Sequence, residues 1–385
     1  RKRFWTNLPK MFAHMWDEDY HNIQMDLIKS RPTYSLMKEA GLDLTEMGGL
    51  DAAAREEDFI ATSPTKIPVI GRGIKASNRA YTGFLNQLRA DVFDDLVKKA
   101  SKVGIYMAED IDAAKGLASY INNATGRGTM GKLTQHAPLL TAGFFSPRLI
   151  ASRFNLLLNP VYYAKLHPFA RKEAITDLIR TTALITTVIG LADYAGADVE
   201  WDPRSSDFGK IRIGKNRYDV YGGFGQYVTL AARMLAGQTK TLKGEVRDLG
   251  PEARQTRGDV LARFLRSKAA PVPAYVMNAL YGENVIGEKF DVKKDTAQMV
   301  TPLFIQDLID GFKDEGVLGA SMKLPSAFGV SSTTIDVVPY KYDSYGREVD
   351  AVQEPDDEAI AEIKRLNTAT GEDGKALVKT ILMDH

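Results

Sequence analysis

Residues 201–227 read Trp201-Asp-Pro-Arg-Ser-Ser-Asp-Phe-Gly-Lys-Ile-Arg-Ile-Gly-Lys-Asn-Arg-Tyr-Asp-Val-Tyr-Gly-Gly-Phe-Gly-Gln-Tyr227. The stretch is dense in glycine, arginine and aromatic residues and follows the most apolar segment of the chain. Residues 210–213 and 217–221 alternate in polarity on either side of Gly214-Lys215-Asn216, the pattern of a β-hairpin with a glycine-containing loop. Because two strands alone are marginally stable in water, we predict a hairpin that packs against helices.

Helical periodicity dominates the other apolar segments. From Tyr81 to Leu96, apolar residues recur at three- and four-residue spacing behind Ser77, a residue type that caps helices. Further helices are predicted at 110–123, 149–158, 169–194, 224–235, 259–267, 272–281, 300–313 and 355–366. Residues 331–345 are rich in β-branched and aromatic residues with Pro339 among them, which favours an extended arm or an edge strand.

The expected fold is therefore mainly α: a multi-helix, bundle-like body with one small β-hairpin and an extended C-terminal arm. We expect an N-terminal helical and linker segment (1–70), a helical pair (71–135), a helical core with the hairpin near 208–221 (136–330), and the arm with an acidic C-terminal helix (331–385). The composition, 44% hydrophobic with a net charge of +1, excludes a chain that is disordered throughout. The absence of cysteine excludes disulfides and thiolate metal sites. The first residue is not Met, which favours a processed product or the tail of a longer polypeptide.

The catalytic motifs that we considered lack their context. A dinucleotide site needs a strand before its glycines, a helix after them and an acidic residue further on. Gly126-Arg-Gly-Thr-Met-Gly131 follows a predicted helix instead of a strand. Gly71-Arg-Gly-Ile-Lys-Ala76 lacks a well-placed acidic residue. Both are interpreted as flexible connectors. His14 and His21 could share a face, but no third metal ligand is indicated. We expect no cofactor, no metal and no enzymatic activity.

Two sets of residues are candidates for contact with partners. Arginine and aromatic residues interleave in the hairpin region, as on surfaces that stack bases and bind phosphates. The candidates for nucleic-acid or partner contact are Arg204, Lys210, Arg212, Lys215, Arg217, Tyr218 and Tyr221. Arginine–aromatic packing inside the hairpin is the alternative. Asp202 and Asp207 flank Arg204, and we favour internal ion pairs or turn capping over acid–base chemistry there.

The second set lies in the arm, where Val337, Tyr340, Tyr342 and Tyr345 are candidates for assembly through a partner's sheet edge or groove. The alternative, that the arm wraps its own domain, stays open.

The segment from Ala174 to Ala197 is the membrane candidate. Between Arg180 and Asp193 lie twelve uncharged residues, four of them threonine, whereas a membrane-spanning helix needs about twenty apolar residues. We therefore favour a buried core helix. An envelope-interacting helix is the minority interpretation.

Several segments together resemble one bacteriophage family. They are Arg31-Pro-Thr-Tyr34 with Ala40-Gly-Leu42, Ser77-Asn-Arg-Ala-Tyr81 with Asn86-Gln-Leu-Arg89 and Phe93, Asn122-Asn-Ala-Thr-Gly-Arg-Gly128, Phe144-Phe-Ser-Pro-Arg148 with Ser152-Arg153, Asp202 to Lys210, Gly222-Gly-Phe224, Gly237, and Pro302-Leu-Phe-Ile-Gln-Asp307. The set is similar to C-terminal regions of large polyvalent or internal virion proteins of the DNA-ejection type, and it spans roughly residues 31 to 330.

The resemblance implies a structural protein that is packaged with the genome in the virion interior and delivered to the host cell during infection. Its implied partners are portal or other internal proteins in an oligomeric assembly, with contact to DNA left open. It implies no catalytic residue. Two alternatives remain: a non-catalytic C-terminal scaffold of a large phage enzyme, and an envelope-interacting module that uses the helix at 178–194.

Overall fold

The computed structural model describes residues 2–45, 68–144, 146–213, 216–240, 245–253, 255–284, 289–292, 295 and 331–334. In this part of the chain the fold is mainly helical with a small antiparallel sheet, which confirms the expected fold class. The helices predicted at 300–313 and 355–366 lie outside the described residues.

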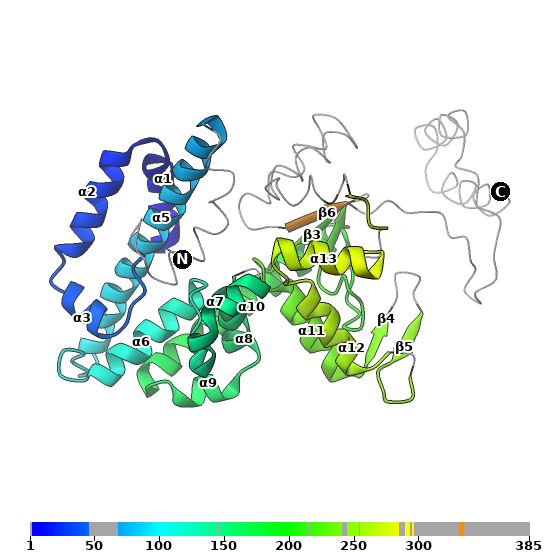
Figure 1. Ribbon diagram of the computed structural model, residues 1–385. Helices are drawn as coiled ribbons and strands as arrows, with labels where there is room; N and C mark the ends of the chain where they lie inside the picture. Colours follow the sequence, from blue (N-terminus) through cyan, green and yellow to red (C-terminus); the bar gives the residue numbers. More distant parts are fainter. Residues whose placement is uncertain are drawn as a thin grey trace, which may run out of the picture.

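The N-terminal helices pack around one long helix. Helices α1 (Lys2–Trp16), α2 (Glu18–Lys29) and α3 (Tyr34–Glu39) lie beside α5 (Pro68–Ser101) and α6 (Ile111–Ala124) (Figure 1). The Asp17 side chain ends α1 and begins α2, since it accepts a hydrogen bond from the backbone N–H of Tyr20. Phe93, Met37 and Leu117 are fully buried where these helices meet. One core thus joins segments far apart in sequence.

Helix α5 corrects one prediction. It begins at Pro68, so Gly71 to Ala76 lie in a helix and not in a flexible connector. Glycine disfavours a helix by only about 1 kcal/mol per residue, which tertiary packing overrides, and α1 packs along α5. The domain boundary expected at residue 70 falls inside this helix, and the first hydrophobic core draws residues from Ile28 to Ala174.

The middle of the chain is a series of helices punctuated by proline. The 3₁₀ helix η2 (Gly131–His136) leads into α7 (Ala137–Gly143), α8 (Pro147–Leu157), α9 (Pro160–Lys165) and α10 (Pro168–Tyr194). Each of these four α-helices has a proline in its first turn, where the missing N–H costs no hydrogen bond. After α10, Gly196 has a φ of +90°, a conformation that favours glycine, and the chain turns into the sheet.

The sheet has the antiparallel order β1-β2-β3-β6. Its strands are β1 (Asp198–Val199), β2 (Ile211–Ile213), β3 (Asn216–Asp219) and β6 (Ser331–Thr334). Strands β2 and β3 are the predicted hairpin, and β1 and β6 widen it to four strands. The first residues of the predicted arm thus form an edge strand on this chain's own sheet.

A second, smaller core follows the sheet. It is formed by residues of α11 (Gly225–Ala236) and α12 (Arg257–Arg266) together with Leu249. The short strands β4 (Gln238–Lys240) and β5 (Val246–Asp248) lie between these helices in the chain, and α13 (Pro271–Tyr281) follows them. Tyr227 of α11 packs edge-to-face on Phe154 of α8 and Phe264 of α12, with ring centroids 5.6 and 5.1 Å away. The β4–β5 hairpin was not predicted, because its short strands, Gln-Thr-Lys and Val-Arg-Asp, are mostly polar and show no apolar alternation.

Candidate functional site

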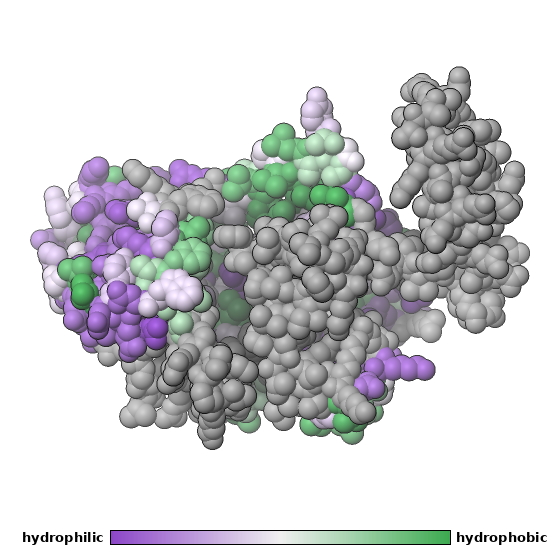
Figure 2. All heavy atoms as spheres, turned by 90° about the horizontal axis from the view of Figure 1, so that it is seen from above, coloured by the Kyte–Doolittle hydropathy of each residue, from purple (hydrophilic) through white to green (hydrophobic). Residues whose placement is uncertain are grey.

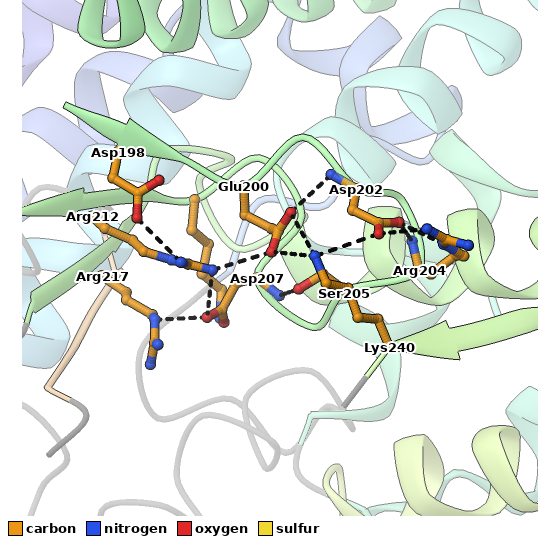
Figure 3. A network of polar contacts seen from close by, with 10 residues as sticks. Asp198, Glu200, Asp202, Arg204, Ser205, Asp207, Arg212, Arg217 and Lys240 are labelled. Atoms are coloured by element: carbon orange, nitrogen blue, oxygen red, sulfur yellow. Dashed lines mark hydrogen bonds and ion pairs between the residues drawn. The ribbon is translucent and has the colours of Figure 1, made fainter. Parts of the chain in front are cut away.

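Asp207 is the centre of a polar network between the sheet and the loop that precedes it (Figure 3). Its side chain is 3% exposed, and its carboxylate lies 2.6 Å from Arg217 Nε, 3.0 Å from Lys210 Nζ and 3.8 Å from Arg212 Nη2. The Asp207 N–H donates to Ser205 Oγ at 3.2 Å. A buried carboxylate requires such partners, because an unpaired charge is costly to remove from water. The network therefore holds the loop against β2 and β3.

Glu200 and Asp202 extend this network towards β4. Arg212 Nη2 and Lys240 Nζ each lie 3.2 Å from Glu200 Oε2. Asp202 accepts two hydrogen bonds of 2.9 Å from the Arg204 guanidinium. These bonds hold the pKa of the Asp202 carboxyl well below its usual range. The interpretation of Asp202 and Arg204 as an internal ion pair is thus confirmed.

The backbone of Arg204 links the network to the second core. Its carbonyl oxygen accepts hydrogen bonds of 2.9 Å from Arg233 Nε of α11 and from the Lys240 N–H of β4. Burial lowers the pKa of the Arg233 guanidinium. The loop, β4 and α11 are consequently held as one unit.

The network is almost neutral. Figure 3 shows its carboxylates facing its cations: Asp198, Glu200, Asp202 and Asp207 face Arg204, Arg212, Arg217 and Lys240. Lys210, which pairs with Asp207, is a fifth cation. Each of these five cations has at least one carboxylate within 4.0 Å. A phosphate would have to compete with these internal partners. Contact with nucleic acid through Arg204, Lys210, Arg212 and Arg217 stays a prediction.

The aromatic candidates of the hairpin are half-buried. Tyr218 lies opposite Ile211 on one side and Ser332 on the other. The Tyr221 hydroxyl covers Gly209, where a Cβ atom would collide with it, and burial raises the pKa of Tyr221. The remaining candidates, Lys215 of the hairpin and Val337, Tyr340, Tyr342 and Tyr345 of the arm, lie outside the described residues.

Helix α10 has one anchored half and one exposed half. In its first half, Glu173 pairs with Lys99 of α5 at 2.6 Å, and Asp177 accepts a hydrogen bond of 2.8 Å from Tyr120 of α6. From Ile179 onwards the helix exposes large apolar side chains to 40–62%: Ile179, Leu184, Val188 and Leu191. Ile189 alone is fully buried among the residues from 179 to 194.

The prediction that this segment is a buried core helix is therefore wrong for the described chain. Periodicity identified the helix correctly, but the neighbouring elements cover only its first half and Ile189. In the view from above, the N-terminal helical part at the left is mainly hydrophilic, and hydrophobic residues gather along part of the upper edge of the picture (Figure 2).

The glycine pattern at 126–131 has a packing role. The Gly128 N–H donates to the Arg148 carbonyl oxygen at 3.1 Å, and a Cβ atom on Gly128 would lie 2.6 Å from Ser152 Cα. Glycine is needed because the connector presses against the backbone of α8. Its neighbour Arg127 is 5% exposed and donates to Thr45 Oγ1 at 3.1 Å. The connector is thus firmly packed and not flexible, and helix α6, instead of a strand, directly precedes its glycines.

Within the described residues, no group of three or more His, Asp and Glu side chains is placed to hold a metal ion. Comparisons with known proteins give no match: no family model, no curated protein and no solved structure is similar to the chain. Any function therefore has to be argued from the residues and their arrangement.

Proposed function

We propose that the chain is a bacteriophage virion protein, packaged with the genome as an internal or ejection component, which acts by contact with other virion proteins. The observation that carries the proposal is the exposed apolar face of α10, formed by Leu184, Val188 and Leu191, which share one side of the helix at i, i+4 and i+7 spacing. Large apolar patches on soluble proteins mark interaction sites, because water is a poor solvent for them. The resemblance of several segments to internal virion proteins of bacteriophages indicates that the assembly is a virion.

The face is suited to a protein partner because α10 is held rigidly at its base. The Glu173–Lys99 and Asp177–Tyr120 contacts fix the first half against α5 and α6, so a partner need not order the second half. Burying the three half-exposed aliphatic side chains of this face contributes roughly 3 kcal/mol, at about 1 kcal/mol each. This gain is smaller than the roughly 4–15 kcal/mol that association costs, so the face contributes to assembly together with further contacts around it.

The proposal assigns a structural role and no catalysis. The acids and bases around Asp207 are paired with one another between elements of the fold, an arrangement that stabilises structure. Portal or other internal proteins are the proposed partners, in the virion interior, with delivery to the host cell during infection.

A second candidate is an envelope-interacting module, and one observation favours it. Helix α10 is long and apolar enough to cross a membrane by length and composition, and 11% of its most apolar window is buried. The twelve uncharged residues from Thr181 to Ala192 extend only about 18 Å, at 1.5 Å per residue, against a hydrocarbon core of about 30 Å. The helix fits shallow insertion better than a full span.

Mass spectrometry of purified particles tests the proposal. We expect peptides of this chain in particles of the phage that encodes it, at a constant ratio to capsid protein after protease treatment of intact particles. Peptides found only in the infected-cell lysate would overturn the virion assignment. Recovery in the host envelope fraction after infection would favour the second candidate.

A further inference from the structure

His14 and His21 form a buried imidazole pair at the junction of α1 and α2. Their Nδ1 atoms lie 3.2 Å apart, a hydrogen bond in which one ring donates and the other accepts. His14 is 0% exposed and His21 4% exposed. The bond needs an Nδ1–H on one ring and a free Nδ1 lone pair on the other, so it cannot form when both rings are doubly protonated.

The site around the pair is closed by α5. Gly83 of α5 faces the His14 ring, and a Cβ atom there would lie 2.6 Å from His14 Cγ. The Tyr20 ring packs edge-on against His14 with centroids 5.1 Å apart. His14 Nε2 is buried and has no hydrogen-bond partner. A doubly protonated His14 ring would therefore carry an Nε2–H that no described residue accepts.

The charged groups that face the pair disfavour a further positive charge. Lys10 of α1 acts on His14, and Arg79 of α5 acts on His21. Glu18 of α2 has the opposite effect on His21, but it is 72% exposed and lies 3.5 Å from Arg79 Nη1, which offsets part of its charge. Burial and these cations lower the pKa of His14 to about 4 and lower that of His21.

We propose that the His14–His21 pair is an acid-sensitive latch that keeps α1 and α2 closed on α5 at neutral pH and releases them on acidification. Protonation costs nothing in an opened state, where water solvates the imidazolium, but is disfavoured in the closed one. The closed state is therefore fully stable above the ordinary imidazole pKa of about 6.5 and loses stability as pH falls towards 4. Opening would uncover α5, including the surface around Gly83.

The size of the effect follows from His14 alone. The pKa of His14 is about 4 in the closed state and about 6.5 in the open state, where water solvates the ring. The equilibrium constant for opening therefore rises about 30-fold when the pH falls from 7.5 to 5. His21 adds to this rise, because its pKa is lowered in the same direction.

Hydrogen exchange of the full chain, corrected for intrinsic amide rates, tests the latch. We expect amides of α1 and α2 to open at least about 10-fold more often at pH 5 than at pH 7.5. The double variant His14→Gln/His21→Gln should have a flat profile over this range. The control Asn7→Ala removes a hydrogen bond of 2.9 Å from α1 to Asp91 without removing a titrating group, so it should raise opening at both pH values and keep the slope.

A histidine NMR titration of the wild-type chain covers the case in which the double variant does not fold. The His14 signal, identified by the single variants, should stay that of a neutral imidazole down to pH 5.5, and the His21 signal should change at a pH below the ordinary imidazole pKa of about 6.5. Titration of both near 6.5, or an exchange profile that is flat in the wild type, would overturn the proposal.

Discussion

Replacing Asp207 by Asn tests whether the polar network holds the sheet and α11 together. The change keeps the shape of the side chain and removes its charge. Asp207 is 3% exposed and is the carboxylate nearest to Arg217, whose side chain is 16% exposed. Loss of one partner from a buried ion pair costs about 3–5 kcal/mol, because the remaining charge stays buried without compensation. We expect a loss of about 3 kcal/mol in the free energy of unfolding, since Asn still accepts hydrogen bonds.

The fluorescence of Trp201 provides the assay. The chain has three tryptophans, and replacing Trp5 and Trp16 by Phe leaves Trp201, which precedes the network loop and donates to Asp193 at 3.1 Å. Urea unfolding followed at this residue reports on the sheet and α10. The matched control is Asp198→Asn, which removes a carboxylate that is 67% exposed and lies 3.2 Å from the same network's Arg212. This control should cost less than about 1 kcal/mol.

Equal effects of the two substitutions would refute the reasoning. If Asp207→Asn also costs less than about 1 kcal/mol, the cations around it are solvated well enough to need no partner, as on a surface. They would then be available to phosphates, and the hairpin would again be the favoured site of nucleic-acid contact.

Two further predictions concern backbone packing and acid stability. Gly128→Ala should lower the free energy of unfolding by more than about 2 kcal/mol in a urea titration, because its Cβ would lie 2.6 Å from Ser152 Cα. The control Gly190→Ala, whose Cβ would have nothing within 4 Å, should stabilise α10 by up to about 1 kcal/mol. Similar unfolding midpoints for the two variants would contradict this prediction. The Asp202 pKa is lowered in the folded chain, so its contribution is present above the ordinary carboxyl pKa of about 3.9 and is lost as pH falls further. Asp202→Asn should therefore flatten the acid limb of a plot of unfolding midpoint against pH, and an unchanged limb would show that Asp202 contributes nothing.

Local sequence patterns predicted the elements well. The hairpin followed from alternation on both sides of Gly214-Lys215-Asn216, and α10 followed from the helical pattern at 169–194. The pairing of Asp202 with Arg204 was also accessible, because the residues are two apart. Such features depend on neighbours in sequence, which is what periodicity reports.

Features that depend on distant segments were not accessible. Lys240 and Asp198 joined the network only through the fold, from β4 and β1. The exposure of Leu184 was missed because an apolar stripe does not say whether another segment covers it. His14 and His21 were seen to be seven residues apart, but their contact comes from two helices separated at Asp17.

The central claim is that the exposed face of α10 is a contact surface in an assembled particle, and photo-cross-linking tests it most directly. A photoreactive amino acid replaces Leu184, which is 46% exposed, and in a matched control it replaces Glu109, an exposed residue in the turn before α6. Irradiation of purified particles should cross-link position 184 to another virion protein and leave position 109 largely unreacted. Equal yields at both positions, or no protein adduct at position 184 in particles that contain the chain, would contradict the account.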